Sequence, residues 1–126
     1  MRIARDLTEL AAPGPGSVVS IGFYDGVHLG HQALISSVLD RAAAAGLTTT
    51  VVTFDRHPAQ VLRPESAPLL LCDLDQKLER LGETGIDQTL VVHFDEERAR
   101  ETAEHFVRDV LVGGLGAKVV VVSHLG

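Results

Sequence analysis

The stretch GFYDGVHLGH, residues 22–31, joins a short apolar segment to a run of residues with helical periodicity. Val18, Val19 and Ile21 precede it and predict a buried strand, and the apolar spacing after it predicts a helix over residues 30–45. A glycine-rich turn between a strand and a helix is a common anion site, because the first backbone N–H groups of the helix are free and its dipole favours negative charge. The stretch therefore predicts a phosphate-binding turn in an α/β domain.

The glycines and histidines of this turn suit phosphate chemistry. Gly22, Gly26 and Gly30 carry no side chain where a phosphate must approach the backbone closely. His28 and His31 are three residues apart, so that both can reach the same place at the first turn of a helix. Imidazoles there can donate hydrogen bonds to phosphate oxygens and offset charge that develops during phosphoryl transfer. We therefore expect His28 and His31 to be catalytic.

Two other interpretations of the turn are weaker. It could shape the chain only, with two solvated histidines. The His-x-x-His spacing could also ligate zinc, but the turn has no thiol to help complete a ligand set, and we expect no metal-ligating residue.

The rest of the chain alternates between strand and helix patterns. This alternation predicts a Rossmann-like α/β fold, a parallel sheet with helices on both faces, in which ligands bind beyond the carboxyl ends of the strands. Near-continuous apolar runs such as VVVV predict strands that are buried on both faces. Besides the strand and helix named above, we expect an edge strand at residues 1–4, strands at 48–54, 88–94 and 118–122, and helices at 73–83 and 96–112.

Size and charge narrow the class of protein. The 126 residues predict one domain, residues 1–126. A formal net charge of −6 argues against a nucleic-acid or membrane surface and leaves room for a phosphorylated small molecule. The single cysteine, Cys72, predicts a reducing compartment, and with no signal peptide visible we expect a cytoplasmic protein.

The turn and three later segments resemble one family. GFYDGVHLGHQ, residues 22–32, resembles the start of the HxGH nucleotidyltransferase superfamily, and more narrowly the FMN adenylyltransferase (FAD synthetase) module of bacterial bifunctional riboflavin kinase/FAD synthetases. Tyr24 stands where that family usually has Phe. The further matches are TFDRHP at 53–58, LDQKLERL at 74–81 and AEHFVRDVLV at 103–112.

The resemblance implies a reaction and a set of site residues. FMN and ATP with Mg²⁺ would give FAD and pyrophosphate, with His28 and His31 on the ATP phosphates. It implies an ATP-binding set and an FMN-binding set of residues. The former is Gly22, Phe23, Tyr24, Asp25, Gly26, His28, Gly30 and His31, and the latter is Phe54, His57 and Pro58. Phe54 read by itself could also be a core aromatic residue, and His57 an ordinary loop histidine.

The chain departs from the family pattern after its last predicted strand. The family continues there with G-x-D/N-F-x-F-G, whereas this chain has SHLG, with Ser123 and Leu125 at two of the pattern positions. We therefore expect a nucleotidyltransferase fold that is incomplete at the C-terminus, without a riboflavin kinase domain. The alternatives are a truncated, non-catalytic ATP- or flavin-binding remnant, another HxGH nucleotidyltransferase, or a chain completed by self-association or by a partner chain.

Overall fold

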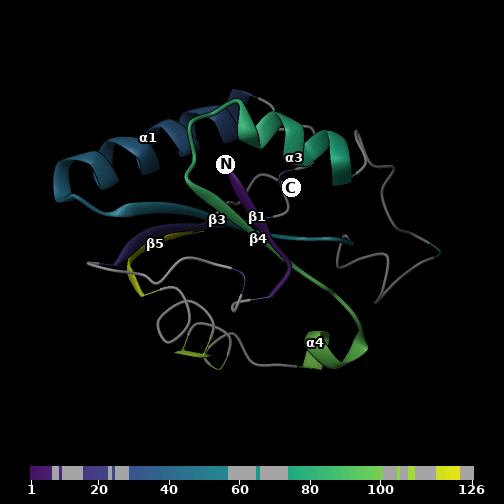
Figure 1. The fold of residues 1–126 in the computed structure, drawn as a ribbon. Helices are drawn as coiled ribbons and strands as arrows, with labels where there is room; N and C mark the ends of the chain where they lie inside the picture. Colours follow the sequence, from purple (N-terminus) through teal and green to yellow (C-terminus); the bar gives the residue numbers. More distant parts are fainter. Residues whose placement is uncertain are drawn as a thin grey trace.

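A computed structural model of the chain describes residues 1–6, 9, 16–22, 24, 29–56, 65, 74–100, 105, 108–109 and 116–122. Within them, one parallel sheet has the strand order β1-β4-β3-β2-β5. Figure 1 shows α1 and α3 on one side of this sheet and α4 on the other, as expected for a Rossmann-like α/β fold. The strands are β1 (Arg2–Ala4), β2 (Ser17–Ile21), β3 (Thr48–Phe54), β4 (Gln88–Val92) and β5 (Ala117–Val122), and the helices are α1 (Leu29–Ala45), α3 (Leu74–Gly82) and α4 (Glu96–Arg100).

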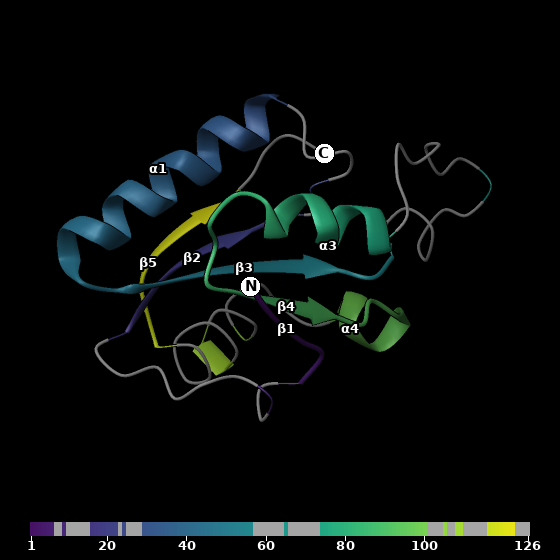
Figure 2. The same cartoon turned by 45° about the horizontal axis from the view of Figure 1, so that its top comes forward.

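The core lies on both faces of the sheet. Because side chains alternate along a strand, Val18 of β2 and Val51 of β3 face the side of α1 and α3, whereas Val19 and Val52 face the other side. All four are fully buried, which explains why these strands read as continuous apolar runs. Figure 2, which looks more nearly onto the sheet, shows α1 running alongside β5 and β2 and α3 lying along β3.

Helix α1 ends where the sequence predicts. Gly46 has a φ of 68°, which glycine adopts without strain, and the N–H of Leu47 donates to the carbonyl of Ala42 at 2.9 Å. This is the six-to-one bond of a Schellman motif, and Leu47 packs against the core beside it. The turn returns the chain directly into β3, so that α1 lies over the sheet and its N-terminus faces the carboxyl ends of the strands.

Two expectations about the elements need correction, and a third is described only at its start. Strand β4 ends at Val92 and not at Phe94, because the N–H of Phe94 donates to the Asp55 carboxylate. The run VVVV is not buried throughout, since Val120 is 38% exposed on β5, an edge strand of the described sheet. Helix α4 spans Glu96–Arg100, and most of the remaining predicted helix lies outside the described residues.

No helix within the described ranges combines the length and apolar character needed to cross a membrane.

Candidate functional site

The direction of the sheet order changes at β2. From β2 the chain steps through β3 to β4 on one side, whereas β5 pairs with the other side of β2. In open parallel sheets such a switch point leaves a crevice at the carboxyl ends of the two diverging strands, and ligands bind there. The turn that begins at Gly22 follows β2 at this end and leads into α1 at Leu29. The HxGH stretch thus lies at the start of the helix that leaves the switch point.

The start of α1 suits an anion. The first backbone N–H groups of a helix have no acceptor within it, and they carry the positive end of its dipole. The first turn of α1 contains no acidic residue, so none of its own side chains compensates this charge. A phosphate at this point would meet the positive end of the helix dipole.

Tyr24 and His31 pack against each other behind the turn. Their rings meet edge to face, with centroids 4.8 Å apart and an interplanar angle of 62°. Both side chains are fully buried, and Tyr24 belongs to the core cluster under α1. The Tyr24 hydroxyl forms a hydrogen bond with the Ser20 hydroxyl of β2. Burial raises the pKa of the Tyr24 phenol, although the bond to Ser20 acts in the opposite direction, so that this group stays neutral at physiological pH.

The burial of His31 bears on its predicted role. The sequence predicts that this imidazole contacts phosphate, but here the ring is closed off from solvent and lies beside Tyr24. Phosphate contact by His31 requires the ring to become accessible at the start of α1. In this structure the His31 ring packs against Tyr24 and has a fixed place in the first turns of the helix.

Two aromatic rings meet at the ends of β3 and β4. Phe54, the last residue of β3, is half-buried, and its ring meets that of Phe94 edge to face, with centroids 5.6 Å apart. Phe54 also packs against the core on the face away from α1. Both interpretations of Phe54, a core aromatic and a site residue at the carboxyl edge of the sheet, are therefore compatible with its position.

Asp55 joins the chain after β3 to the chain after β4. One carboxylate oxygen lies 2.6 Å from His93 Nδ1, and the other accepts the N–H of Phe94 at 3.0 Å. Burial of this carboxyl acts to raise its pKa, but the hydrogen bonds from His93 and Phe94 and the nearby charges of His93 and Arg5 outweigh it and lower the pKa. A charged Asp55 therefore holds the two strand ends together.

Lys77 of α3 is a buried cation at the carboxyl end of β3 that the sequence analysis did not single out. It is only 2% exposed, and its ammonium donates to the hydroxyl of Thr53 at 3.1 Å and to the carbonyl of Phe54 at 2.9 Å. The signal was present in the sequence, because Lys77 lies one residue before Leu78 and four before Leu81, on the apolar face of the predicted helix.

Several predicted site residues cannot be located in the fold. The backbone of Gly30 lies in the first turn of α1. The residues that lie outside the described ranges are Phe23, Asp25, Gly26, His28, His57 and Pro58.

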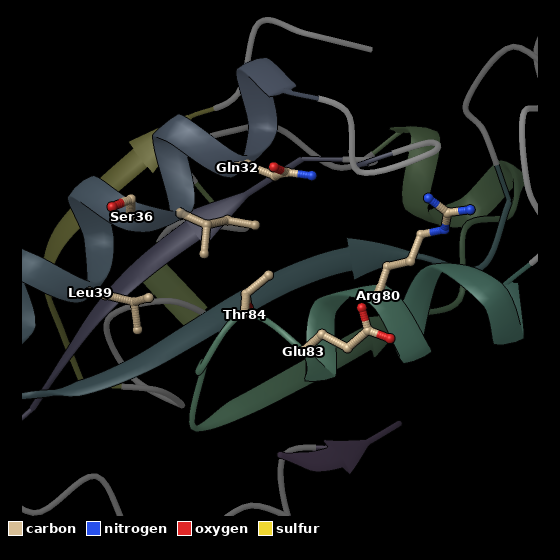
Figure 3. A pocket seen from close by; sticks show the side chains of 7 residues that line it. Gln32, Ser36, Leu39, Arg80, Glu83 and Thr84 are labelled. Atoms are coloured by element: carbon tan, nitrogen blue, oxygen red, sulfur yellow. The ribbon is translucent and has the colours of Figure 1, made fainter.

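A polar groove of about 410 Å³ separates α1 from α3 (Figure 3). Arg80 and Glu83 contribute opposite charges on one side, and Gln32 and Ser36 of α1 contribute polar groups on the other. The groove lies between helices and its charges balance, so that it does not provide the positive site that a phosphate needs. Its described lining is Gln32, Ile35, Ser36, Leu39, Arg80, Glu83 and Thr84.

In the part of the chain that the structure describes, no three His, Cys, Asp or Glu side chains gather in a group that could hold a metal ion.

Comparison with known proteins identifies the family. The model of the FAD synthetase family matches residues 11–124 of this chain. The chain belongs to the FAD synthetase family. This match favours the flavin family over other HxGH nucleotidyltransferases, and it spans the turn at residues 22–31 as well as the TFDRHP segment.

Curated relatives of this FAD synthetase chain carry matching names. A bifunctional riboflavin kinase/FMN adenylyltransferase from Escherichia coli K12 is 37% identical over 98% of this chain and 40% of its own length. A protein of the same name from Pseudomonas fluorescens is 36% identical over 94% of this chain and 38% of its own length. Another from Listeria monocytogenes is 40% identical over 75% of this chain and 31% of its own length. The chain thus spans about 40% or less of the length of these relatives.

A solved structure shares the fold of this family member. A crystal structure described as a macrolide-efflux protein from Streptococcus pneumoniae superposes with a TM-score of 0.78 and 26% identity. The superposition covers 96% of this chain and 41% of the other. The likeness supports the parallel sheet and its order.

Proposed function

We propose that this chain transfers AMP from ATP to FMN, which yields FAD and pyrophosphate. One observation carries the proposal: the FAD synthetase match covers residues 11–124, on a sheet whose switch point lies at the HxGH stretch. The names of the relatives pair riboflavin kinase with FMN adenylyltransferase. The matched family is FAD synthetase, so we assign the adenylyltransferase reaction alone to this chain.

The proposed reaction needs no protein nucleophile. A phosphate oxygen of FMN attacks the α-phosphorus of ATP, and a new P–O bond forms. The bond from the α-phosphorus to the oxygen that bridges it to the β-phosphorus breaks, and pyrophosphate leaves with the electron pair. Mg²⁺ arrives with ATP as part of the substrate. The chain contributes positioning of the two phosphates and stabilisation of the charge that develops between them.

The residue roles follow the order of the turn. We assign His28 and His31 to the ATP phosphates and to the charge of the transition state. The first turn of α1, which contains no acidic residue and carries the positive end of the helix dipole, supports an anion site there. The backbone around the turn would line ATP, and Phe54 with its neighbours would line the flavin. These sets are Gly22, Phe23, Tyr24, Asp25, Gly26 and Gly30 for ATP, and Phe54, His57 and Pro58 for FMN.

The proposal includes a setting for the protein. We assign residues 1–126 to one domain, because the described strands share a single sheet. The ligands are the small molecules ATP and FMN. A cytoplasmic location agrees with the lone cysteine and the ordinary soluble composition, in which 45% of residues are hydrophobic and 22% charged.

The direct test is FAD formation by the purified chain with FMN, ATP and Mg²⁺, followed by chromatography. His28→Ala should lower the rate by about 10²–10³-fold, the usual cost of losing one preorganised donor. His105→Ala is the matched control, because His105 is an exposed histidine paired with Asp109 on the surface. The proposal fails if the wild-type chain forms no FAD under these conditions.

A second candidate function is nucleotide binding without turnover. The complete burial of His31 favours it, because a ring that solvent cannot reach does not contact phosphate in this arrangement. Calorimetric titration with ATP and FMN, alongside the assay, separates the two functions. Binding with no FAD formed supports this candidate, and turnover excludes it.

A further inference from the structure

Packing alone does not explain Lys77. An ammonium that is 2% exposed has lost nearly all of its water, a cost that only good hydrogen bonds offset. Replacing a whole buried ion pair by apolar side chains is often neutral or stabilising, whereas removing a single buried donor leaves its acceptors unsatisfied. A methionine would fill the same space at this position of α3, but the Thr53 hydroxyl and the Phe54 carbonyl would lose this donor.

Two acceptors of Lys77 are the last two residues of β3. Pairing between β2 and β3 ends at Ile21 and Val52, whereas pairing between β3 and β4 continues to Phe54 and Val92. Thr53 and Phe54 therefore extend past the end of β2 at the carboxyl edge of the sheet. Lys77 reaches this extension from α3 and bonds both residues, at 3.1 Å to the Thr53 hydroxyl and 2.9 Å to the Phe54 carbonyl.

We propose that Lys77 is a positioning residue for the acceptor flavin, acting through Phe54. Its ammonium fixes the backbone of Phe54, and the Phe94 ring, 5.6 Å away between centroids, fixes the aromatic plane. Together these contacts hold the Phe54 ring and the start of the following turn in one place. This inference rests on the proposed function, because it names Phe54 as part of the flavin side. Lys77 itself is buried and touches no substrate, so it is not a catalytic residue.

The test compares Lys77→Met with the matched control Arg41→Met in the full chain. Arg41 is an exposed cation on α1, so that the control removes a charge of the same sign away from the site. FMN affinity is measured by the quenching of flavin fluorescence, and ATP affinity by calorimetry. Lys77→Met should weaken FMN binding about 10-fold or more, since small misplacements of contact groups are costly. ATP affinity should change less than about 2-fold, and Arg41→Met should change neither affinity.

A double-mutant cycle separates positioning from a general structural role. If Lys77 acts through Phe54, Lys77→Met should add little to the loss of FMN affinity in a Phe54→Leu background. Independent, additive losses would overturn the proposal, and so would equal loss of FMN and ATP affinity. Thr53→Val removes one acceptor without changing the shape of the side chain, and it serves if Lys77→Met does not fold. It should weaken FMN binding in the same direction by a smaller factor, and unchanged binding would overturn the proposal.

The same titrations distinguish failure of this inference from failure of the proposed function. A wild-type chain that does not bind FMN removes both. A wild-type chain that binds FMN, with Lys77→Met binding it equally well, leaves the adenylyltransferase proposal in place and removes the positioning role.

Discussion

Tyr24 has a left-handed backbone with a φ of 60°, a fully buried ring and a hydroxyl bonded to Ser20. A non-glycine residue in that conformation is uncommon and is held there only by its surroundings. Here the surroundings are the bond to Ser20 and the edge-to-face contact with His31. Tyr24 thus couples the end of β2 to the first turns of α1. Ser20 is the partner that accommodates the Tyr24 hydroxyl in the core.

We expect Tyr24→Phe to lower the free energy of unfolding by about 1 kcal/mol, the usual net value of a buried hydrogen bond, because the Ser20 hydroxyl loses this partner. Urea unfolding measures the change. The double variant Ser20→Ala/Tyr24→Phe should lose less stability than the sum of the losses of the two single variants, since it leaves neither hydroxyl without its partner. Strictly additive losses would show that the two hydroxyls do not interact.

The Asp55 carboxylate predicts an acid-sensitive stability. Its pKa in the folded chain lies below the ordinary value of 3.8, which an unfolded carboxyl keeps. The stabilisation is therefore complete above that ordinary value and is lost as the pH falls through the lower, folded pKa. The charged groups that face Asp55 are His93 and Arg5, and Asp95 faces His93.

Urea unfolding between pH 7 and pH 3 tests this prediction with Asp55→Asn and the control Asp40→Asn, which changes an exposed carboxyl on α1. The difference in stability between the wild type and Asp55→Asn should be present at about pH 5 and shrink below about pH 4. Asp40→Asn should follow the wild-type curve. A difference that stays constant down to pH 3 would contradict a lowered pKa at Asp55.

At the scale of elements, the sequence predicted the features that depend on interactions between neighbouring residues. The bounds of α1 followed from apolar periodicity and from Gly46, since both act within a few residues. The site contacts depend on the tertiary fold instead. Asp55 and His93 are 38 residues apart, and Lys77 is 23 residues from Phe54. No local sequence pattern predicts either contact. The exposure of Val120 likewise depends on β5 lying at an edge of the sheet.

The junction between β2 and β5 depends on Gly16. This residue has a φ of 116°, and a Cβ placed on it would lie 2.8 Å from the carbonyl oxygen of Gly116 and 2.8 Å from Cγ of Lys118. That carbonyl accepts the N–H of Ser17 at 3.0 Å, at the point where the two strands begin to pair. A side chain at residue 16 would therefore overlap the Gly116 carbonyl, which accepts a hydrogen bond where β2 and β5 begin to pair.

We expect Gly16→Ala to lower the free energy of unfolding by at least about 2 kcal/mol, from backbone strain and steric overlap together. Gly46→Ala is the control, because Gly46 also has a positive φ, of 68°, but a Cβ there meets nothing within 4 Å. That variant should lose only the cost of the left-handed backbone, about 1–2 kcal/mol. Chemical denaturation of both variants checks that Gly16→Ala loses more stability than Gly46→Ala. Equal losses of stability would show that the contacts with Gly116 and Lys118 cost no free energy.

At the scale of the whole molecule, charge opposes the proposed ligands. The chain carries a formal net charge of −6, and both ATP and FMN are anions. Binding therefore depends on local positive potential at the carboxyl edge of the sheet. The start of α1 and the ammonium of Lys77 provide such potential among the described residues, although Lys77 is already engaged with Thr53 and Phe54. Neither group approaches the charge of a divalent cation bound to the phosphates.

We therefore expect FAD formation to depend strongly on Mg²⁺ that is bound to ATP. Chelation with EDTA should lower the rate at least about 100-fold, since a metal ion on the reacting phosphates supplies several kcal/mol of charge stabilisation. Added Mg²⁺ in excess of the chelator should restore the rate. The unfolding midpoint of the protein without nucleotide should be the same with and without EDTA, because the ion enters with the substrate. An unchanged rate of FAD formation in EDTA would mean that side chains at the HxGH turn neutralise the phosphates without a metal ion. His28 and His31 would then provide most of the charge stabilisation.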